Sequence, residues 1–260
     1  MTRIPFATLA LTLAALAHPG VLAQQPAPTA PAPPPTPRAA APIDLTGYWV
    51  SVVTEDWRWR MLTPPKGDYT SVPLNPEGRK AADTWDPAQA ASNGCKPYGA
   101  AAVLRMPGRL HVTWDGDTAL KIETDAGQQT RLLRFDKSLK PAGDRTWQGF
   151  SAAEWELAGG GGRGGAGAAA GRGAAAPPRD GSLKVVTTNL RAGYLRKNGV
   201  PYSESAVMTE HLDRHNAYGT DWLTVTTLVE DPKYLTQPFI TTTHFKKEAD
   251  GSKWSPAPCE

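Results

Sequence analysis

The stretch VMTEHLDRH, residues 207–215, decides the fold class because its spacing fits either a helix or a strand. On a helix, His211 and His215 would share one face and could hold a metal ion. Val207 and Thr209 are β-branched, which favours a strand, and four residues of strand separate the two histidines by about 13 Å. One ion cannot be held across that gap, and the HExxH pattern is missing. We therefore expect a strand here and no metal site.

As a strand, this stretch carries its charged groups on two different faces, since alternate residues point to opposite sides. One face holds Val207, Thr209, His211, Asp213 and His215, and the other holds Met208, Glu210, Leu212 and Arg214. The second face has the larger apolar side chains, so we expect it to point into the molecule. A buried Glu210 must find a partner or take a raised pKa. We expect Arg214, near the mouth, to be that partner.

The rest of the chain repeats this pattern in short segments separated by turn signals. We expect further strands within RLHVTWDG (109–116), ALKIETDAG (119–127), QQTRLLRFD (128–136), GFSAAEWEL (149–157), GSLKVVTTNLR (181–191), DWLTVTTLVED (221–231) and PFITTTHFKK (238–247). A first strand begins in residues 44–62 and could bend or continue past Glu55. Asn75 before Pro76 predicts a helix start, with a second helical turn in residues 86–92. We therefore expect an all-β fold, an antiparallel barrel or sandwich with one or two short helices.

Three segments are expected to lie outside the barrel. Residues 1–23 combine Arg3, an apolar stretch and the small residues VLA before Gln24, which is typical of a cleaved secretory signal peptide. Residues 24–42 are nearly all Pro, Ala and Gln, a composition that favours an extended linker. Residues 158–180 are mostly Gly, Ala, Arg and Pro, which predicts a disordered loop that enlarges a hairpin. The folded domain is expected over 43–260, with no membrane span once the signal is removed.

Cysteine content and charge narrow the possibilities further. Cys95 and Cys259 are the two cysteines, and the formal net charge is +3. A chain exported to the periplasm or secreted meets an oxidising compartment, so we expect these thiols to form a disulfide. The charge is small and no basic stripe carries interleaved aromatic residues, which argues against nucleic acid as a partner. The chain has no G-x-S-x-G and no Gly-rich phosphate loop, and no cofactor is expected.

Two resemblances bear on the fold. GYW, residues 47–49, resembles the G-x-W that opens lipocalin-like barrels, in which the Trp, here Trp49, plugs the closed end. Four further blocks resemble an uncharacterised group of secreted bacterial proteins: residues 95–112, 146–156 with 181–190, 199–214 and 229–247. That resemblance implies a lipocalin-like antiparallel barrel and supports the disulfide, but it implies no activity. The Gly/Ala insert replaces a short turn of that group.

The leading functional hypothesis is a barrel that binds a small apolar or aromatic molecule in its lumen. Nine tryptophans suit such a lumen, although a large barrel also needs large fillers. The expected ligand-binding residues are Glu210, Arg214, Met208, Leu212, Trp222, Glu230 and Trp49. One alternative is a lyase, isomerase or hydratase that uses Glu210 as acid or base, with Tyr202 or a histidine at the mouth. Another is an envelope-associated structural protein with a filled barrel, in which Glu210 forms a structural pair.

Overall fold

The computed structural model describes residues 33–157 and 180–259. By its internal contacts the chain divides into Met1–Pro34 and Pro35–Glu260, and all elements described below belong to the second unit. The predicted signal peptide, the first part of the predicted linker and the predicted loop up to residue 179 lie outside the described residues.

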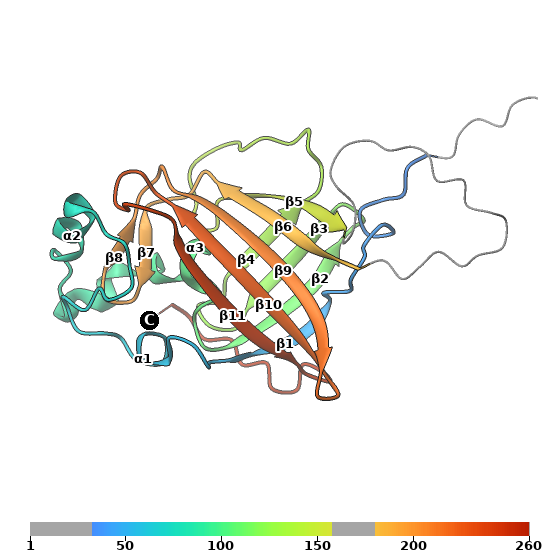
Figure 1. Cartoon of the computed structure of the whole chain (residues 1–260), viewed down its shortest axis with the longest axis horizontal. Coiled ribbons are helices and arrows are strands. Elements are labelled where there is room, and N and C mark those ends of the chain that lie inside the picture. Colours follow the sequence, from blue (N-terminus) through green and yellow to red (C-terminus); the bar gives the residue numbers. More distant parts are fainter. Residues whose placement is uncertain (1–32, 158–179, 260) are drawn as a thin grey trace, which may run out of the picture. The chain divides into compact units, whose positions relative to one another are not determined.

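Nine strands form a closed barrel, in line with the alternating segments of the sequence (Figure 1). The order around the barrel is β1-β11-β10-β9-β6-β5-β4-β3-β2. The strands are β1 (Gly47–Val52), β2 (Arg109–Asp115), β3 (Ala119–Thr124), β4 (Thr130–Arg134), β5 (Phe150–Leu157), β6 (Gly181–Thr188), β9 (Val207–Ala217), β10 (Thr220–Glu230) and β11 (Phe239–Lys247). Each expected segment supplies one strand. The first strand does not continue past Glu55, because a helical turn follows it.

One neighbouring pair in the barrel, β4 and β5, is parallel, whereas the other pairs are antiparallel. A closed ring with an odd number of strands cannot alternate in direction all the way round, so one parallel pair is a geometric requirement. A parallel pair also needs a connection that runs back to the starting end of the barrel. Residues 135–149 make this return along the outside of the barrel, and we call them the crossover.

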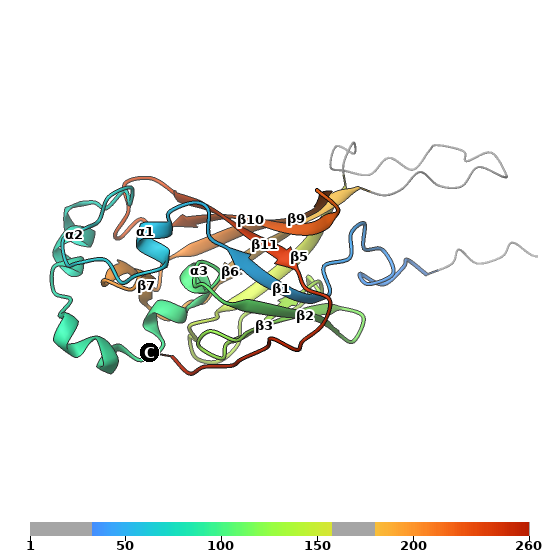
Figure 2. The same ribbon diagram turned by 90° about the horizontal axis from the view of Figure 1, so that it is seen from below.

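Short helices and a two-stranded hairpin form a cap at one end of the barrel (Figures 1 and 2). The cap comprises α1 (Trp57–Arg60), α2 (Pro76–Ala82), the 3-10 helices η1 (Pro87–Asn93) and η2 (Lys96–Tyr98), α3 (Ala100–Val103), β7 (Gly193–Arg196) and β8 (Val200–Tyr202). Asn75 caps α2 as predicted, because its side-chain oxygen accepts from the backbone N–H of Gly78 at 2.8 Å. The described part of the chain thus has more short helices than the one or two expected.

Two hydrophobic clusters fill the barrel and join it to the cap. The first packs inward-facing residues of opposite strands against each other, including Leu120, Leu183 and Leu223. The second packs Met208 and other residues at the barrel end against cap residues such as Tyr202. The barrel interior is therefore a core of interlocking side chains rather than an open tube.

Trp49 of β1 lies in the first hydrophobic cluster. It is fully buried, and its indole N–H donates to the carbonyl of Leu45 at 2.9 Å. The Nζ atom of Lys247 lies 4.3 Å from the centre of its ring. Gly47 precedes it with φ 104°, where a Cβ atom would lie 2.8 Å from the same Nζ. The GYW segment therefore supplies a buried tryptophan to the barrel core.

Two structural findings bear on the predicted domain boundaries. β5 and β6 form an antiparallel hairpin in which Leu157 faces Gly181, so the insert does connect the two strands of a hairpin. At the N-terminus, the carbonyl of Pro37 accepts from the indole N–H of Trp155 at 2.9 Å, and the backbone N–H of Arg38 donates to Asp117. The folded unit therefore begins before the predicted boundary at residue 43.

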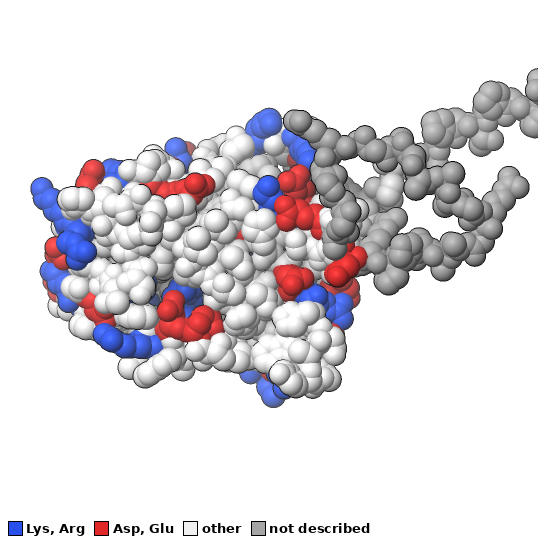
Figure 3. Space-filling view, viewed as in Figure 1, with Lys and Arg blue, Asp and Glu red and all other residues white. Residues whose placement is uncertain are grey.

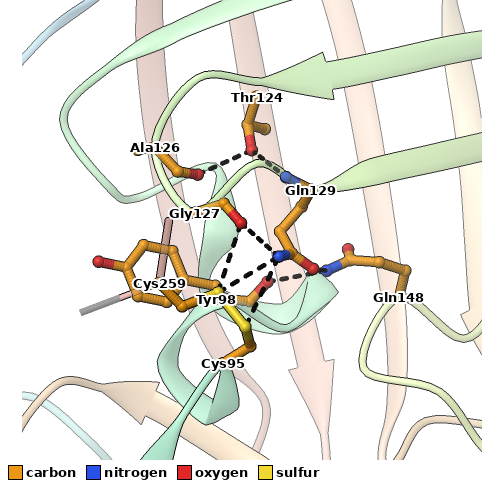
Figure 4. The surroundings of a disulfide bond; sticks show 8 residues. All are labelled: Cys95, Tyr98, Thr124, Ala126, Gly127, Gln129, Gln148 and Cys259. Atoms are coloured by element: carbon orange, nitrogen blue, oxygen red, sulfur yellow. Dashed lines mark hydrogen bonds between the residues drawn. A yellow bond between two sulfur atoms is a disulfide. The ribbon is translucent and has the colours of Figure 1, made fainter. Parts of the chain in front are cut away.

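The predicted disulfide between Cys95 and Cys259 is present, with Cα atoms 5.2 Å apart (Figure 4). It ties the C-terminal segment to the cap, beside the turn that joins β3 and β4. The side-chain amide of Gln129 donates to the carbonyl of Gly127 in that turn and lies 3.4 Å from Cys259 Sγ. Gln148, at the end of the crossover, donates to the side-chain oxygen of Gln129 at 2.9 Å. The disulfide therefore joins the cap to the C-terminal segment, and hydrogen bonds of Gln129 and Gln148 connect the β3–β4 turn and the crossover beside it.

Candidate functional site

Glu210 lies inside the barrel, as the parity of β9 predicts, and only 1% of its side chain is exposed. Its two carboxylate oxygens accept from Nη1 and Nη2 of Arg131 on β4, at 3.1 and 2.6 Å. The Nη2 atom also donates to the hydroxyl of Thr187 at 3.3 Å. That hydroxyl lies 2.8 Å from the hydroxyl of Ser151. The result is a two-pronged, buried ion pair with its own polar neighbours.

The predicted pairing of Glu210 with Arg214 is wrong. Arg214 lies toward the barrel end away from the cap, where its Nη2 donates to Asp221 at 2.6 Å and its Nη1 donates to the carbonyl of Asp44 at 3.0 Å. Four residues of strand separate Glu210 from Arg214, or about 13 Å, which is the same gap that separates the two histidines. The spacing that separates the two histidines therefore also keeps Arg214 away from Glu210.

The surroundings of Glu210 leave little scope for chemistry. One guanidinium contacts both of its oxygens and the side chain is 1% exposed, so a substrate has no open path to the carboxylate. Its neighbours across the sheet are Val185 on β6 and Thr227 on β10, and both are buried. The cavities described below have other residues in their walls. This arrangement fits the hypothesis of a structural pair better than that of an acid or base.

The other residues expected to hold a ligand divide into two sets. Met208 and Leu212 face inward as predicted, but they are packed in the two hydrophobic clusters. Trp222 and Glu230 have the opposite parity on β10: the buried positions are Leu223, Val225, Thr227 and Val229. Their expected inward direction is therefore wrong, and Glu230 is exposed. The lumen site predicted from the sequence is not assembled by these side chains.

Tyr202 lies on β8 in the cap, not at the barrel mouth beside Glu210. It is 1% exposed and belongs to the second cluster. Burial raises the pKa of its hydroxyl above the ordinary value. Gly99 and Gly193 leave room for the ring, since a Cβ on either would come within 2.6 Å of the Tyr202 oxygen. Tyr202 is thus a packing residue of the cap.

The histidines of β9 lie on its outer face, as predicted. The Nδ1 atom of His211 is 3.0 Å from a carboxylate oxygen of Glu156. Within residues 33–157 and 180–259, no three His, Cys, Asp or Glu side chains gather as a set of metal ligands. None of the helices in this part of the chain has the length and apolar character needed to cross a bilayer.

One cavity combines an apolar floor with several charged side chains, and it is a groove on the outside of the barrel. It has a volume of about 340 Å³ and lies between the crossover and the outer faces of β4, β5 and β6. Its apolar walls are formed by Leu139, Pro141, Phe150, Ala152 and Val186. We call it the crossover groove, because the parallel pair of strands requires the crossover that forms one of its sides.

Charged side chains surround the crossover groove. Four are cationic (Arg134, Lys137, Lys140 and Lys184) and two are anionic (Asp136 and Glu154). Glu154 holds Lys137 at 2.9 Å and lies 3.7 Å from Lys184, and these contacts, led by the Lys137 hydrogen bond, lower its pKa. Arg134 lies over the ring of Phe150 at 5.3 Å. The groove therefore combines an apolar floor with an excess of positive charge.

The face formed by β9, β10 and β11 is different. Figure 3 shows charged side chains at both ends of this face and few between them. Its outward positions include Thr209, Thr224, Thr226 and Thr242. This threonine face offers a site for control substitutions outside the groove.

Comparison of the chain with protein-family models, with curated proteins and with solved structures finds no match. Sequence reasoning missed both Arg131 and the crossover groove. The alternation in QQTRLLRFD gives each face of β4 one Leu and one Arg, so it does not show which Arg is buried. The groove depends on the strand order, which no local pattern contains.

Proposed function

We propose that this protein binds a small molecule that has an aromatic or apolar body and an anionic group, and that the site is the crossover groove. The observation that carries the proposal is the combination of an apolar floor with four cationic side chains in one groove of about 340 Å³. This volume lies at the lower end of the range for small-molecule sites, about 300–1,000 Å³. Phe150 and Leu139 would contact the body, and Lys140 and Arg134 would attract the anionic group.

The groove suits this ligand class better than the lumen does. The lumen around Glu210 is filled by Arg131 and its neighbours, so a ligand there would have to displace a buried ion pair. Binding is also better supported than catalysis, because the groove presents three lysines and one arginine without a paired nucleophile and base. A purely structural role for the filled barrel is the competing reading, and it predicts no ligand in the groove.

Anilinonaphthalene sulfonate is a suitable test ligand, because it joins aromatic rings to a sulfonate and fluoresces when bound to apolar surfaces. We expect saturable binding at one site in the wild-type protein. Ala152→Trp places a large ring on the groove floor and should abolish that binding. Lys140→Glu reverses one charge at the rim and should weaken it roughly three- to tenfold at low salt.

Two control variants keep this test specific. Thr242→Trp adds the same ring to the threonine face, and Lys233→Glu reverses an exposed charge in the loop between β10 and β11. Both should bind the dye as the wild type does. Equal affinities for Ala152→Trp and Thr242→Trp would show that the dye binds elsewhere, and the proposed site would then be rejected.

We also propose that the chain is exported to the periplasm or secreted, and that its barrel is of the lipocalin-like kind. Residues 1–23 support export, and the disulfide is of the kind that persists in oxidising compartments. The buried Trp49 of the GYW segment supports the lipocalin-like assignment. Protein purified from its own host should have the mass of a chain that begins at Gln24 and carries oxidised cysteines. An intact residue 1 would contradict signal cleavage.

A further inference from the structure

Three arginines from separate parts of the chain converge in the cap. Arg60 ends α1, Arg105 follows α3, and Arg196 ends β7. Their exposed fractions are 3%, 7% and 3%. Buried charged groups normally have a partner for each hydrogen-bond donor, so we expect each of these guanidinium groups to have acceptors nearby.

Two of the three arginines each hold one carboxylate. Arg60 pairs with Glu55 through Nη1, and its Nε donates to the carbonyl of Arg105 at 2.9 Å. Arg105 donates from Nη2 to Asp56 at 2.9 Å. These contacts leave Nη2 of Arg60 and Nη1 of Arg105 with no hydrogen-bond partner in the described part of the chain.

Arg196 is the exception, because all three of its guanidinium nitrogens lack hydrogen-bond partners among the described residues. Its guanidinium carbon lies 4.7 Å from the ring centre of Trp59 and 5.9 Å from that of Phe239. Such ring faces attract a cation but do not replace hydrogen-bond acceptors in the guanidinium plane. Burial, and then the nearby charge of Arg105, lower the pKa of Arg196 to about 10, so the group is still charged at neutral pH.

All three arginines line one small cavity, together with Trp59, Met106 and Lys197. The cavity volume is about 10 Å³. A space of this size holds a single particle about as large as a water molecule. An anion there would accept hydrogen bonds from several guanidinium groups and would offset the repulsion between like charges. A neutral water could accept only two of these bonds and would leave the repulsion in place.

We propose that this cavity binds one small inorganic anion of halide size, held by Arg60, Arg105 and Arg196. The bound anion links α1, the segment after α3 and β7, and so stabilises the cap. The site is separate from the crossover groove, and its argument does not depend on the proposed function.

Bromide provides the direct test, because its anomalous X-ray scattering marks its position. In crystals of the full protein grown from sodium bromide, we expect an anomalous peak in the cavity between the three guanidinium groups. In solution, replacing sodium gluconate by sodium bromide at constant ionic strength should raise Tm by roughly 2–6 °C and reach saturation. A water molecule in the cavity without an anomalous peak would overturn the proposal, and so would equal Tm values in the two salts.

A pair of variants separates site binding from general salt effects. Arg196→Met removes three of the unpaired donors and should abolish the bromide-dependent rise in Tm. Arg191→Met is the matched control, because Arg191 also lies over a tryptophan, Trp147, at 5.0 Å but is exposed. The control should keep the full bromide response. If Arg196→Met does not fold, the bromide crystal of the wild-type protein decides the question, and an unchanged bromide response in a folded Arg196→Met contradicts the proposal.

Discussion

At the scale of single residues, the geometry of the buried Glu210–Arg131 pair fits a role in ordering the barrel strands better than a role in catalysis. Taking both groups out of water costs several kcal/mol, and their attraction roughly offsets this cost. The pair therefore contributes little net stability, but either group alone would be a buried charge without a partner. Because it links β4 to β9 across the interior, we expect it to exclude barrel packings in which those strands are shifted.

We therefore expect a single substitution in this pair to lower the free energy of unfolding far more than the double substitution does. Arg131→Met leaves the carboxylate of Glu210 buried and unpaired, and it should lower the free energy of unfolding by about 3–5 kcal/mol. Arg131→Met combined with Glu210→Leu should recover most of that loss. Urea unfolding of both variants measures the difference. If the loss of unfolding free energy in the double variant equals the sum of the losses in the two single variants, the two residues are not coupled. The structural role assigned to Glu210 would then be wrong.

A second residue-scale prediction concerns Asp221 at the barrel end away from the cap. Hydrogen bonds from Asn216 and then Arg214 lower the pKa of Asp221 below its usual value. A lowered folded-state pKa means that the stabilisation is present above the unfolded pKa and is lost as pH falls through the folded one. Asp221→Asn should therefore reduce stability at neutral pH by about 0.5 kcal/mol and flatten the loss of stability below about pH 4. Urea unfolding across this pH range checks it.

The control for that measurement is Asp213→Asn, which removes an exposed carboxylate from the strand that pairs with the one carrying Asp221. Below about pH 4, the free energy of unfolding of this variant should fall with pH as that of the wild type does. Identical curves for the wild type and Asp221→Asn would contradict the assigned role of Asp221.

At the scale of elements, strands with strict alternation were predictable from sequence, and elements defined by packing were not. In β9 one parity carries Met208 and Leu212, and the structure buries it. In β10 both parities carry apolar residues, which is why Trp222 and Glu230 were assigned to the wrong face. The β7–β8 hairpin is buried on nearly all sides. It therefore lacks the alternation of apolar and polar residues that is typical of a strand with one face exposed to solvent. The helix α1 lies in an aromatic-rich segment that reads equally well as strand.

The β5–β6 hairpin gives an element-scale prediction. Since Leu157 and Gly181 already face each other, a two-residue Asn-Gly turn can join them in place of the insert. We expect this shortened chain to keep its free energy of unfolding within about 1 kcal/mol of the wild type and to bind the dye normally. A larger loss, measured by urea unfolding, would show that the insert contributes to the fold.

At the scale of the whole molecule, two hydrophobic clusters join the barrel to its cap, and one disulfide crosslinks the chain. The disulfide spans 164 residues, which is most of the folded unit. Neither the crossover groove nor the arginine cluster has a local sequence signature: the groove depends on how the crossover lies over β4, β5 and β6, and the cluster joins segments far apart in the chain. The sequence therefore predicts the barrel and the position of Glu210, whereas the sites depend on topology that periodicity does not encode.

Removing the disulfide tests whether it stabilises the fold and holds the C-terminal segment on the cap. Cys95→Ser with Cys259→Ser should lower the free energy of unfolding by about 2–5 kcal/mol, because the unfolded chain regains a long open loop. The C-terminal segment should also become a site of proteolysis that is protected in the wild type, since the disulfide fastens it to the cap. Limited proteolysis of both proteins followed by mass spectrometry checks this expectation. Identical cleavage patterns in the two proteins would contradict it.

The most direct measurement of the central claim is an amide NMR titration of the full protein with anilinonaphthalene sulfonate. We predict that the perturbed signals belong to the crossover and to outward-facing residues such as Ala152, Lys184 and Val186. The signals around Glu210 and Arg131 should stay unchanged. Perturbations centred on Glu210, or none in the crossover groove, would contradict the claim that this barrel binds its ligand on the outside.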